Sequence, residues 1–478
     1  MEKLKNYING QLVDPVDGKY AEIINPATGT AYVLAPLSGP ADVDAACQAA
    51  AAAFPEWSRM APGARSRALH LAADALEAKR DEIVEAEVTN TGRPRALFRD
   101  EEFPALIEHF RFFASAARDL RGLSAGSYAP GYESVVRREP IGVCAGVSPW
   151  NYPLNMGIWK LGPALAAGNT VVLKPSDTTP VSTAIAAEVI GGLLPPGVFN
   201  VIIGDRDTGR ALVAHPTPRL ISVTGSVRAG KEVSAAAATD LKRVHLELGG
   251  KAPILVFDDI DPTFAAEGVA AGGFLNAGQD CEAATRVLVQ EGVYDAFVEA
   301  LVKVAQNTRY GAPDDEGIAY GALNSEAHLD KVQGYIDRLP AHATVHTGGK
   351  PDRRDGGYFY PPTIVTGVQQ DDEIVQQEVF GPVITVQKFS SEAEAIRLAN
   401  DVDYGLAAGI WSKNHEVITR VSGALDFGKV WVNCHLVVAP EMPNNGRKQS
   451  GHGNDMSVLA IEEYTQLKHV MSAIPDAE

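Results

Sequence analysis

From about residue 140 onward, the chain alternates short apolar runs with segments of helical periodicity. Apolar runs occupy residues 141–147, 171–173, 199–203 and 219–223, and helical patterns cover residues 154–167 and 181–190. Because these runs do not alternate apolar with polar residues, both faces of the strands are expected to be buried. Buried strands separated by helices predict a parallel sheet with crossover helices.

A second series of the same kind follows the pair Gly249 and Gly250. Its strands are expected at residues 253–257, 286–290, 383–389, 406–411 and 429–433, with helices at 263–276 and 294–306. Two successive α/β units that meet near residue 248 predict a crevice between two domains, where ligands commonly bind.

Two further segments complete the expected organisation. The alanine-rich stretch at residues 45–53 favours a helix, because alanine has the highest helix propensity. Residues 128–138 form an extended excursion that we interpret as a β-arm. Arms of this kind often pair across a subunit interface.

The composition excludes several classes of protein. The 478 residues suggest two or three domains, and no apolar run reaches the roughly 18 residues that cross a bilayer. The N-terminus lacks the apolar stretch of a secretory signal. The four cysteines, Cys47, Cys144, Cys281 and Cys434, lie far apart with no CxxC pair. Neither a disulfide framework nor a metal site is therefore expected, and a reducing, cytoplasmic setting fits best.

The acidic balance of the chain narrows the choice of partners. Sixty Asp and Glu residues against 42 Lys and Arg residues give a formal net charge of −18. An acidic surface argues against nucleic acid and anionic membranes as partners. The charge is compatible with a cationic substrate, and equally with a role in solubility alone.

Two residues carry candidate covalent and acid–base chemistry. Cys281 stands in a short loop between an expected helix and the next strand. Such a thiol is held on rigid supports and remains open to a ligand, although an isolated cysteine is more often an inert packed thiol. Glu247 lies between Leu246 and Leu248 and precedes two glycines. Burial there would raise its pKa toward the range of a general base; the alternative is a surface carboxylate on a linking turn.

Three polar turns follow expected strands of the first series. Asn151, in the turn at residues 148–153, has an amide that can donate a hydrogen bond to an oxyanion. Lys174 and the residues after it can hold ribose hydroxyls, and the turn at residues 224–226, with Gly230, suits a pyrophosphate. The usual GxGxxG fingerprint is absent from the sequence. None of these motifs identifies a function by itself.

In this order, the motifs resemble those of the aldehyde dehydrogenase superfamily. The resemblance runs from Tyr7 to about Thr465 and includes the family's later signature, Gln-Glu-Val-Phe-Gly-Pro at residues 377–382. It implies an α/β fold with two doubly wound domains, a Rossmann-like cofactor domain and a catalytic domain, plus a small β-arm oligomerisation element. The corresponding ranges are 1–122 with 139–248, then 249–436, then 123–138 with 437–478. Family members are usually dimers or tetramers, so a homodimer or homotetramer is expected.

The resemblance also implies a role for each catalytic residue. Cys281 matches the family's nucleophile, Glu247 its general base and Asn151 its oxyanion donor. An aldehyde would become a carboxylic acid through a Cys281 thiohemiacetal and thioester, which water hydrolyses with Glu247 as base. Members that pass the acyl group to coenzyme A lack this base, so hydrolysis is expected.

For the cofactor, the resemblance implies NAD. The implied contacts are Ser148, Pro149, Trp150, Lys174, Ser176, Asp177, Gly204, Gly209, Gly225, Ser226, Gly230, Leu248, Glu378 and Phe380. Lys174 matches the lysine on the adenine ribose, Glu378 the glutamate on the nicotinamide ribose, and Phe380 the aromatic residue beside the nicotinamide. The acidic residue Asp177 repels a 2′-phosphate, which leaves NADP as the less favoured alternative.

A finer resemblance, to the γ-aminobutyraldehyde or ω-aminoaldehyde dehydrogenases, implies the substrate. The stretches that carry it are residues 101–105, 110–114, 276–281, 311–316 and 441–443. The expected substrate-binding residues are Glu102, Tyr152, Met156, Trp159, Asp280 and Glu282. Their carboxylates would attract an ammonium group and their aromatic rings would supply cation–π walls, as for 4-aminobutanal. An enzyme for uncharged aliphatic or aromatic aldehydes and a non-catalytic structural descendant are the alternatives.

Departures from those relatives affect the substrate tunnel. Glu282 follows the nucleophile where the relatives usually have a small residue. Asn155 and Gly157 change the wall near Met156, and residues 444–447 form an individual version of the late loop. The extra charge of Glu282 either deepens a preference for cations or reflects a specialised pathway.

Overall fold

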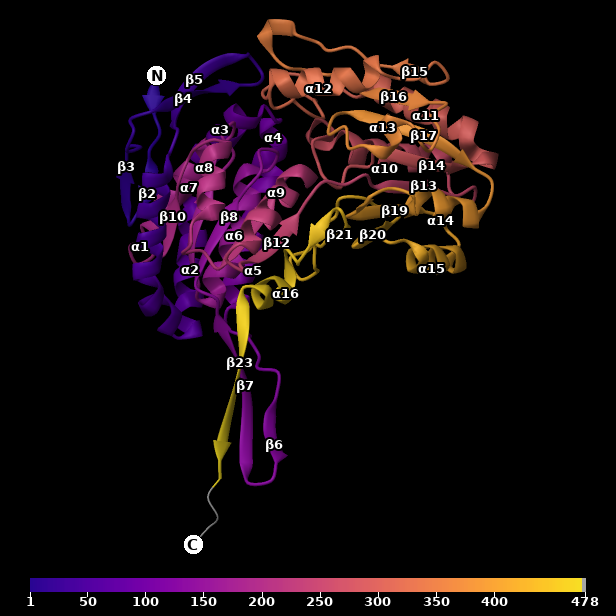
Figure 1. Cartoon of the computed structure of the whole chain (residues 1–478). Helices are drawn as coiled ribbons and strands as arrows, with labels where there is room; N and C mark the ends of the chain where they lie inside the picture. Colours follow the sequence, from indigo (N-terminus) through magenta and orange to yellow (C-terminus); the bar gives the residue numbers. More distant parts are fainter. Residues whose placement is uncertain (475–478) are drawn as a thin grey trace.

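The computed structural model describes residues 1–474 of the chain. Figure 1 shows two α/β lobes side by side and a long arm that projects away from both. The first lobe is drawn mainly in indigo and magenta and the second mainly in orange, so the division follows the order of the chain. Among the described helices, none is both long and apolar enough to cross a membrane.

The first lobe is built on an eight-stranded sheet in the order β22-β12-β11-β8-β9-β10-β2-β3. Its central strands run parallel and are β8 (Val143–Val147), β9 (Thr170–Lys174), β10 (Phe199–Val201), β11 (Leu220–Thr224) and β12 (Arg243–Glu247). The antiparallel edge strands are β2 (Asn6–Ile8), β3 (Gln11–Val13) and β22 (Gly451–His452). The parallel strands lie where the unalternating apolar runs predict them.

Helices cover both faces of this sheet. One face packs against α2 (Pro62–Ala78), α3 (Arg80–Thr91), α5 (Phe103–Ala116), α6 (Pro153–Ala167) and α7 (Val181–Gly191), and the other against α1 (Pro40–Arg59), α8 (Arg206–Ala214) and α9 (Val227–Ala238). Val171 and Leu173 of β9 pack on the first side, and Val172 between them packs on the second. Each central strand is thus buried on both faces, which is why its sequence lacks polar alternation.

The second lobe contains a seven-stranded sheet in the order β15-β16-β17-β14-β13-β19-β20. Its strands are β13 (Pro253–Val256), β14 (Arg286–Gln290), β15 (Thr344–Thr347), β16 (Thr363–Thr366), β17 (Val383–Phe389), β19 (Ala407–Trp411) and β20 (Lys429–Val432), parallel except for β15 at the edge. Helices α10 (Pro262–Phe274), α11 (Tyr294–Asn307) and α12 (Glu326–Asp337) pack on one face, and α14 (Glu392–Asn400) and α15 (His415–Ala424) on the other. Two doubly wound lobes confirm the expected α/β fold.

The arm is a three-stranded antiparallel sheet in the order β23-β7-β6. Its hairpin consists of β6 (Ala125–Ala129) and β7 (Tyr132–Pro140), and β23 (Thr465–Ala473) pairs with β7 along its whole length. The segment at residues 128–138 is therefore a β-arm, whereas its role in oligomerisation stays a prediction. Within the C-terminal segment, β22 and α16 (Ser457–Glu463) join the first lobe instead of the arm.

The loop that carries Cys281 departs from the predicted helix. Helix α10 ends at Phe274, and Asn276 and Ala277 have φ values of 49° and 58°, in the left-handed region. A residue with a side chain costs about 1–2 kcal/mol in that region, so contacts elsewhere must hold the conformation. The helix predicted for residues 263–276 is two residues too long, because these contacts override the helical pattern.

The two lobes present opposite ends of their strands to each other. The first lobe contributes the carboxyl ends of β8, β11 and β12, and the switch point of its strand order lies between β8 and β11. The second lobe contributes loops that lead into the amino ends of β14 and β17. The residues between these ends line a pocket.

Candidate active site

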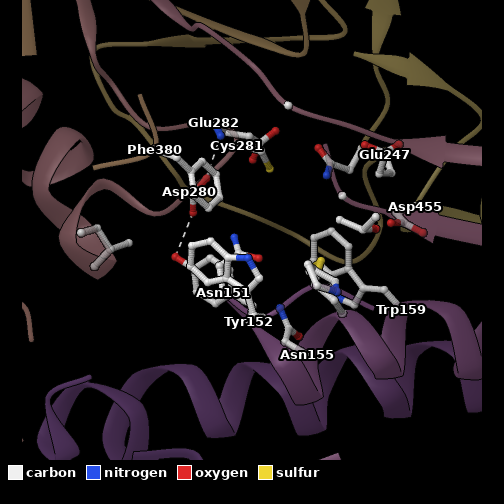
Figure 2. Close-up of a pocket in the computed structure, with 18 of the residues that line it drawn as sticks. Asn151, Tyr152, Asn155, Trp159, Glu247, Asp280, Cys281, Glu282, Phe380 and Asp455 are labelled. Carbon is white, nitrogen blue, oxygen red and sulfur yellow. Dashed lines mark hydrogen bonds between the residues drawn. The ribbon is translucent and has the colours of Figure 1, made fainter. Parts of the chain in front are cut away.

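The pocket between the lobes has a volume of about 470 Å³. Cys281, Glu247 and Asn151 all line it, although they come from three different loops or strands. In Figure 2, Cys281 and Glu247 lie along one side of the pocket, with Asn151 and Tyr152 facing them. The structure thus brings together the three residues to which the sequence assigns catalytic roles.

Hydrogen bonds within the Cys281 loop fix its shape. The Asn276 side-chain amide donates to the carbonyl of Gln279 (3.2 Å), and the Gln279 side chain donates back to the Asn276 carbonyl (3.0 Å). The Asp280 carboxylate accepts from the backbone N–H of Glu282 (2.7 Å). The half-buried Cys281 side chain is therefore held between two closed turns, and it lines the pocket.

The surroundings of the thiol disfavour its ionisation. Burial raises the pKa of Cys281 well above its ordinary value, and the carboxylates of Asp280 and Glu282 raise it further. A thiol attacks as a nucleophile in its thiolate form, so nucleophilic use of Cys281 would need a group that takes this proton. Glu247, in the same pocket, is a base of the required kind.

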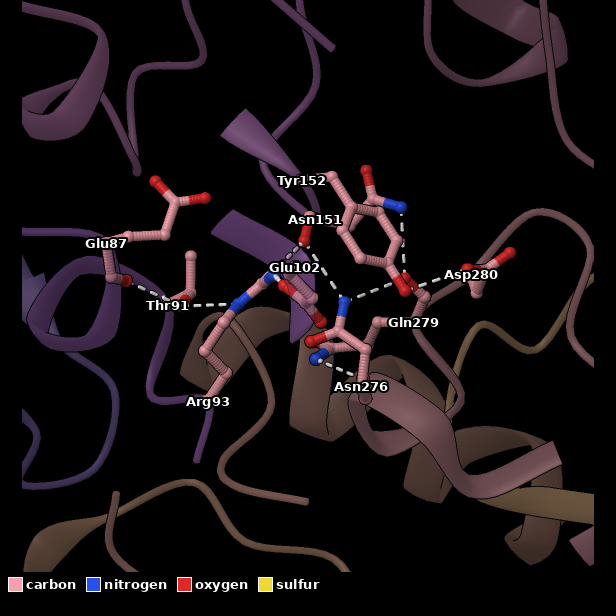
Figure 3. A network of polar contacts seen from close by, with 9 residues as sticks. All are labelled: Glu87, Thr91, Arg93, Glu102, Asn151, Tyr152, Asn276, Gln279 and Asp280. Carbon is pink, nitrogen blue, oxygen red and sulfur yellow. Dashed lines mark hydrogen bonds and ion pairs between the residues drawn. The ribbon is translucent and has the colours of Figure 1, made fainter. Parts of the chain in front are cut away.

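Asn151 is fixed from both lobes, as Figure 3 shows. Its side-chain amide donates to the carbonyl of Gln279 (3.0 Å). Its own carbonyl accepts from the Asn276 amide (3.1 Å) and from the Arg93 guanidinium. A side-chain amide has two hydrogens, so one remains for an acceptor in the pocket. Asn151 can therefore donate to an oxyanion formed beside Cys281.

Glu247 is a buried carboxylate at the end of β12. Burial raises its pKa well above the ordinary value, and the nearby Asp455 carboxylate adds to the effect. Its Oε1 atom has no hydrogen-bond partner among residues 1–474. A buried carboxylate with a raised pKa and an open lone pair is a stronger base than an ordinary carboxylate, which suits general-base catalysis.

Part of the expected cofactor site lines the pocket directly. These residues are Pro149, Trp150, Gly225, Ser226, Leu248, Glu378 and Phe380. The Trp150 and Phe380 rings stand edge to face with centroids 5.2 Å apart. Glu378 accepts from the backbone N–H of Gly250 (2.8 Å), and a Cβ atom on Gly249 would lie only 2.5 Å from the carboxylate. The backbone therefore needs glycine at residue 249 to approach this carboxylate, whose pKa burial raises to about 7.

The remaining expected cofactor residues lie outside this pocket, along the carboxyl edge of the first sheet. They are Ser148, Lys174, Ser176, Asp177, Gly204, Gly209 and Gly230. A Cβ atom on Gly209 of α8 would lie 3.5 Å from the Lys174 side chain, so the two positions are in contact range. Ser226 caps α9, whose first N–H groups can bind an anion. Gly230 instead lets α9 pack closely on Leu248, because a Cβ atom there would come within 2.5 Å of that side chain.

Groups that can hold a ribose, an anion and an aromatic ring thus follow one another along the carboxyl edge of the first sheet, at the switch point of its strand order. Lys174 ends β9, Ser226 begins α9 and Glu378 lies across the pocket. An extended dinucleotide has the same sequence of chemical groups, and such ligands bind at the switch point of a doubly wound sheet. The residues present therefore fit a dinucleotide.

All six expected substrate-binding residues line the pocket, but two of their charges are already paired. Glu102 forms an ion pair with the buried Arg93, and Glu282 forms one with Lys429 at 3.1 Å. These cations offset the two carboxylates. The extra charge of Glu282 therefore does not deepen the attraction of the tunnel for a cation.

The aromatic residues of the tunnel are also engaged. The Tyr152 hydroxyl donates to Asp280 (2.8 Å), and the Arg93 guanidinium lies 4.9 Å from the Tyr152 ring centre. The Trp159 indole donates to Nδ1 of His109 (3.0 Å). Met156 adds apolar surface to the same wall.

Three neighbours of Cys281, Glu247 and the tunnel residues belong to none of the sequence motifs: Arg93, His109 and Asp455. His109 follows Glu102 by seven residues, so helical spacing predicts that the two share a face. Asp455 has no such local signal, because the C-terminal segment brings it to the pocket by tertiary packing.

The fold and these groups define the class of protein. It is an oxidoreductase in which residues that fit a dinucleotide lie beside a thiol, between two doubly wound lobes. The family model described as "Aldehyde dehydrogenase family" matches residues 13–470. The chain belongs to the aldehyde dehydrogenase family.

Relatives cover nearly the whole chain. The betaine aldehyde dehydrogenase of Mesorhizobium japonicum is 38% identical over 470 residues, 97% of this chain and 96% of the relative. An aldehyde dehydrogenase of Emericella nidulans is 40% identical over 477 residues, 98% of this chain and 95% of the relative. The structure of betaine aldehyde dehydrogenase from Staphylococcus aureus in complex with NAD+ has a TM-score of 0.96 and 35% identity, covering 99% of this chain and 96% of that one. The superfamily is confirmed, but two of these three relatives are named for betaine aldehyde and none for an aminoaldehyde.

Proposed function

We propose that this enzyme oxidises an aldehyde to a carboxylic acid, with NAD as hydride acceptor and with hydrolysis of a Cys281 thioester as the second half-reaction. The observation that carries the proposal is the arrangement of Cys281, Glu247 and Asn151 around one pocket. The Staphylococcus aureus relative, which shares the fold over nearly its full length, supports NAD as the cofactor.

In the first half-reaction, the Cys281 sulfur bonds to the aldehyde carbon while the thiol proton moves to Glu247. The electron pair of the C=O π bond moves to oxygen, and the Asn151 amide and the Cys281 backbone N–H donate to that oxyanion. One such donor contributes about 3 kcal/mol, which is roughly a hundredfold or more in rate. Bound NAD supplies the hydride acceptor that turns the thiohemiacetal into the thioester.

Before the second half-reaction, Glu247 releases the thiol proton to solvent. It then takes a proton from a water molecule and returns this proton to the Cys281 thiolate at the end of the cycle. The water oxygen bonds to the thioester carbon, the C–S bond breaks, and sulfur leaves as the thiolate. A buried carboxylate with a raised pKa is suited to this step, because it holds a proton more firmly than an ordinary carboxylate does. The product is the carboxylic acid.

The chain offers NAD contacts at three places. Lys174 and Asp177 provide a donor and an acceptor for ribose hydroxyls, the N-terminus of α9 suits the pyrophosphate, and Glu378 and Phe380 lie beside the thiol. Asp177 is exposed, and its charge repels a 2′-phosphate. We therefore expect a higher kcat/KM with NAD; an equal or higher value with NADP would overturn this preference.

For the substrate, we infer an aldehyde with an amino group at its far end, such as 4-aminobutanal. Asp280 supports this inference. Its carboxylate accepts a hydrogen bond from Tyr152, and it forms no ion pair with another residue in the range 1–474. A primary ammonium can donate to such a carboxylate, whereas a quaternary ammonium can only be attracted by charge and by the faces of Tyr152 and Trp159. Betaine aldehyde is the second candidate, since relatives carry that name. Uncharged aldehydes are the remaining alternative.

The substrate inference predicts a ranking of kcat/KM values. We expect 4-aminobutanal to exceed butanal by about tenfold, the ratio that corresponds to one weak ion pair. Asp280→Asn should remove most of this difference while keeping an oxygen that accepts from Glu282. Equal values for the two aldehydes in the parent would refute selection by charge, and a higher value for betaine aldehyde would favour the second candidate.

The role of the thiol is tested by Cys281→Ala. The variant should lose aldehyde turnover and retain NAD binding, measured by nicotinamide absorbance and by calorimetry. Cys434→Ala is the matched control, because Cys434 does not line the pocket and its loss should leave turnover intact. Turnover by Cys281→Ala, or none by the parent with any aldehyde, would exclude the proposal.

We further infer that the arm joins copies of this chain into a homodimer or homotetramer. Tyr128, Leu467 and Met471 expose 70%, 52% and 48% of their surface on its strands. Exposed apolar side chains along a projecting sheet are typical of an interface. The double variant Leu467→Glu with Met471→Glu should elute as a monomer in size-exclusion chromatography, whereas an unchanged mass would contradict this role.

A further inference from the structure

A buried polar cluster lies directly behind the Glu247 carboxylate. His245 and Glu247 are two residues apart on β12, so their side chains share one face of the strand. Asp455, which follows β22, completes the cluster, and Figure 2 shows it next to Glu247. His245, Glu247 and Asp455 expose 1%, 4% and 1% of their surface, and one potential ligand atom from each lies within 4.8 Å of the others.

The imidazole of His245 is aimed at both carboxylates. Its Nδ1 atom forms a hydrogen bond with the Ser222 hydroxyl (2.8 Å), which fixes the ring. Its Nε2 atom lies 3.9 Å from Glu247 Oε1 and 3.8 Å from Asp455 Oδ1. These three atoms lack a hydrogen-bond partner in the part of the chain that the structure describes. A small movement of either carboxylate would complete a bond to Nε2.

The chemistry of the cluster selects one form of His245. Ionised carboxylates only accept hydrogen bonds, so the proton belongs on Nε2, and Nδ1 then accepts from Ser222. Burial lowers the pKa of His245 to about 4, which keeps the ring neutral near pH 7. His245 is therefore a neutral donor that faces two acceptors.

A metal ion is a poorer occupant of this cluster. His, Glu and Asp are all metal ligands, but the buried Lys160 ammonium already lies 3.8 Å from Asp455 Oδ2. A cation beside it would be repelled, and it would take the Glu247 lone pair that the hydrolysis uses. The neutral N–H of His245 has neither disadvantage.

We propose that His245 is a positioning residue that donates to Glu247 and keeps this carboxylate available as the base for thioester hydrolysis. The proposal rests on the hydrolytic function assigned to Glu247. A donor to the ionised form of a carboxylate favours ionisation, and so it counteracts the repulsion between Glu247 and Asp455. The charged or titratable groups that face this cluster are Lys160, Asp455, His452 and Tyr464 around His245, and Glu282, Lys429 and Cys281 around Glu247.

The packing leaves no room for a side chain larger than histidine, and a much smaller one would leave a cavity. A Cβ atom on Gly453 would lie 2.2 Å from His245 Cδ2, so the backbone is in direct contact with the ring. We therefore choose His245→Leu, which removes the donor at similar volume, and His245→Gln, which keeps an N–H near the position of Nε2. Ser222→Ala is a milder third variant, because it removes only the group that fixes the ring.

The test is the pH dependence of kcat. A pre-steady-state burst of reduced nicotinamide is measured as well, because a burst shows that hydrolysis limits turnover. In His245→Leu, the acid limb of kcat should move to higher pH by about one unit, with a roughly tenfold lower kcat on that limb. His245→Gln should restore most of the shift, and Ser222→Ala should show a smaller shift in the same direction. A purely structural role would lower thermal stability in all three variants without moving the limb.

Two outcomes separate this inference from the proposed function. If the parent oxidises aldehydes and the acid limb of His245→Leu coincides with that of the parent, His245 has no positioning role and the proposed function stands. If the parent shows no turnover, the proposed function fails. In either case, the tautomer can be measured by ¹⁵N NMR of labelled histidine, which reads His245 without any turnover. A proton on Nδ1 would overturn the inference directly.

Discussion

Two polar clusters flank Cys281, and they differ in how completely their hydrogen bonds are satisfied. Around Asn151 in Figure 3, Asn151, Asn276 and Gln279 exchange side-chain and backbone hydrogen bonds, and Arg93 donates to the Asn151 carbonyl. In the same figure, Glu87 Oε2 lies outside this saturated part and lacks a hydrogen-bond partner among residues 1–474. Behind Glu247, by contrast, Glu247 Oε1, His245 Nε2 and both Asp455 oxygens lack partners among residues 1–474. A saturated network specifies one geometry, whereas an unsaturated one retains the capacity to bind or move a proton.

The difference has an energetic side. An unsatisfied buried polar group costs about 1–3 kcal/mol, so the cluster behind Glu247 reduces the stability of the fold. The Arg93 network lies on the other side of the thiol and holds the two lobes together through Asn151. We infer that the saturated network around Asn151 fixes the oxyanion donor, whereas the unsaturated cluster behind Glu247 keeps the base reactive.

The largest expected effect comes from removing the base on the unsaturated side. Glu247→Gln should reduce turnover by about a hundredfold or more, because general-base catalysis contributes at least that much. Because Glu247 also takes the thiol proton, formation of the acyl-enzyme should slow as well. The acyl-enzyme that does form should persist and be visible by mass spectrometry as a modified Cys281. Glu267→Gln, on the exposed side of α10, is the control and should keep full turnover.

The same carboxylate sets the direction of the pH profile. As the proposed general base, Glu247 would act when it is deprotonated, and its pKa lies well above the ordinary value, with burial as the larger cause. Parent turnover should therefore still rise with pH above the range in which an ordinary carboxyl group titrates. A profile that is already flat above pH 5 would show that no carboxylate with a raised pKa limits the reaction.

The second largest effect comes from breaking the saturated side at Arg93. Its guanidinium is buried and pairs with Glu102, so Arg93→Met leaves that carboxylate without its cation. Breaking a buried ion pair from one side costs about 3–5 kcal/mol. The thermal-unfolding midpoint at a fixed scan rate measures this loss, and kcat should fall as well because the Asn151 carbonyl loses a donor.

Arg95→Met is the matched control for that variant. Arg95 pairs with Glu85 and Asp314, whose side chains are largely exposed, and exposed ion pairs contribute about 0–1 kcal/mol. The midpoint of Arg95→Met should therefore stay near that of the parent. An equal decrease in the unfolding midpoint of the two variants would show that the burial of Arg93 does not increase its contribution to stability.

The sequence predicts the fold better than it predicts the clusters. Strands such as β9 and β14 are buried on both faces, so their apolar runs are read directly from the chain. The order of the motifs also places Cys281, Glu247 and Asn151 near one crevice. These inferences depend on local pattern and on resemblance, both of which the sequence contains.

The pairing of charges cannot be read in the same way. Glu102 is expected to face a substrate with its charge free, yet a π-helical turn at Phe98–Glu102 directs it to Arg93, nine residues earlier in the chain. π-Turns of this kind have no reliable sequence pattern and often occur near functional sites. Asp455 reaches Glu247 from more than 200 residues away, so only tertiary packing reveals the contact. The alternation along β12 does predict that His245 shares a face with Glu247. This spacing is visible in the sequence, although it belongs to no motif.

The smallest expected effect probes strain inside the saturated network. Ala277 lies between Asn276 and Gln279 with φ at 58°, where glycine is favoured, and it is buried. Ala277→Gly should relieve about 1–2 kcal/mol of strain. It should also lose a buried methyl group worth about 0.8 kcal/mol and increase chain entropy in the unfolded state by about 0.4–1 kcal/mol. These contributions nearly cancel, so the unfolding midpoint should hardly move.

Ala283→Gly is the control, because it removes a similarly buried methyl group at a position without positive φ. This variant should be less stable than the parent by about 1–2 kcal/mol, since only the lost methyl group and the greater entropy of the unfolded chain contribute. The difference between the two variants is a measure of the strain stored next to the nucleophile. Equal destabilisation would mean that the network imposes no strain on the loop, and its rigidity would then have to come from the loop's own hydrogen bonds.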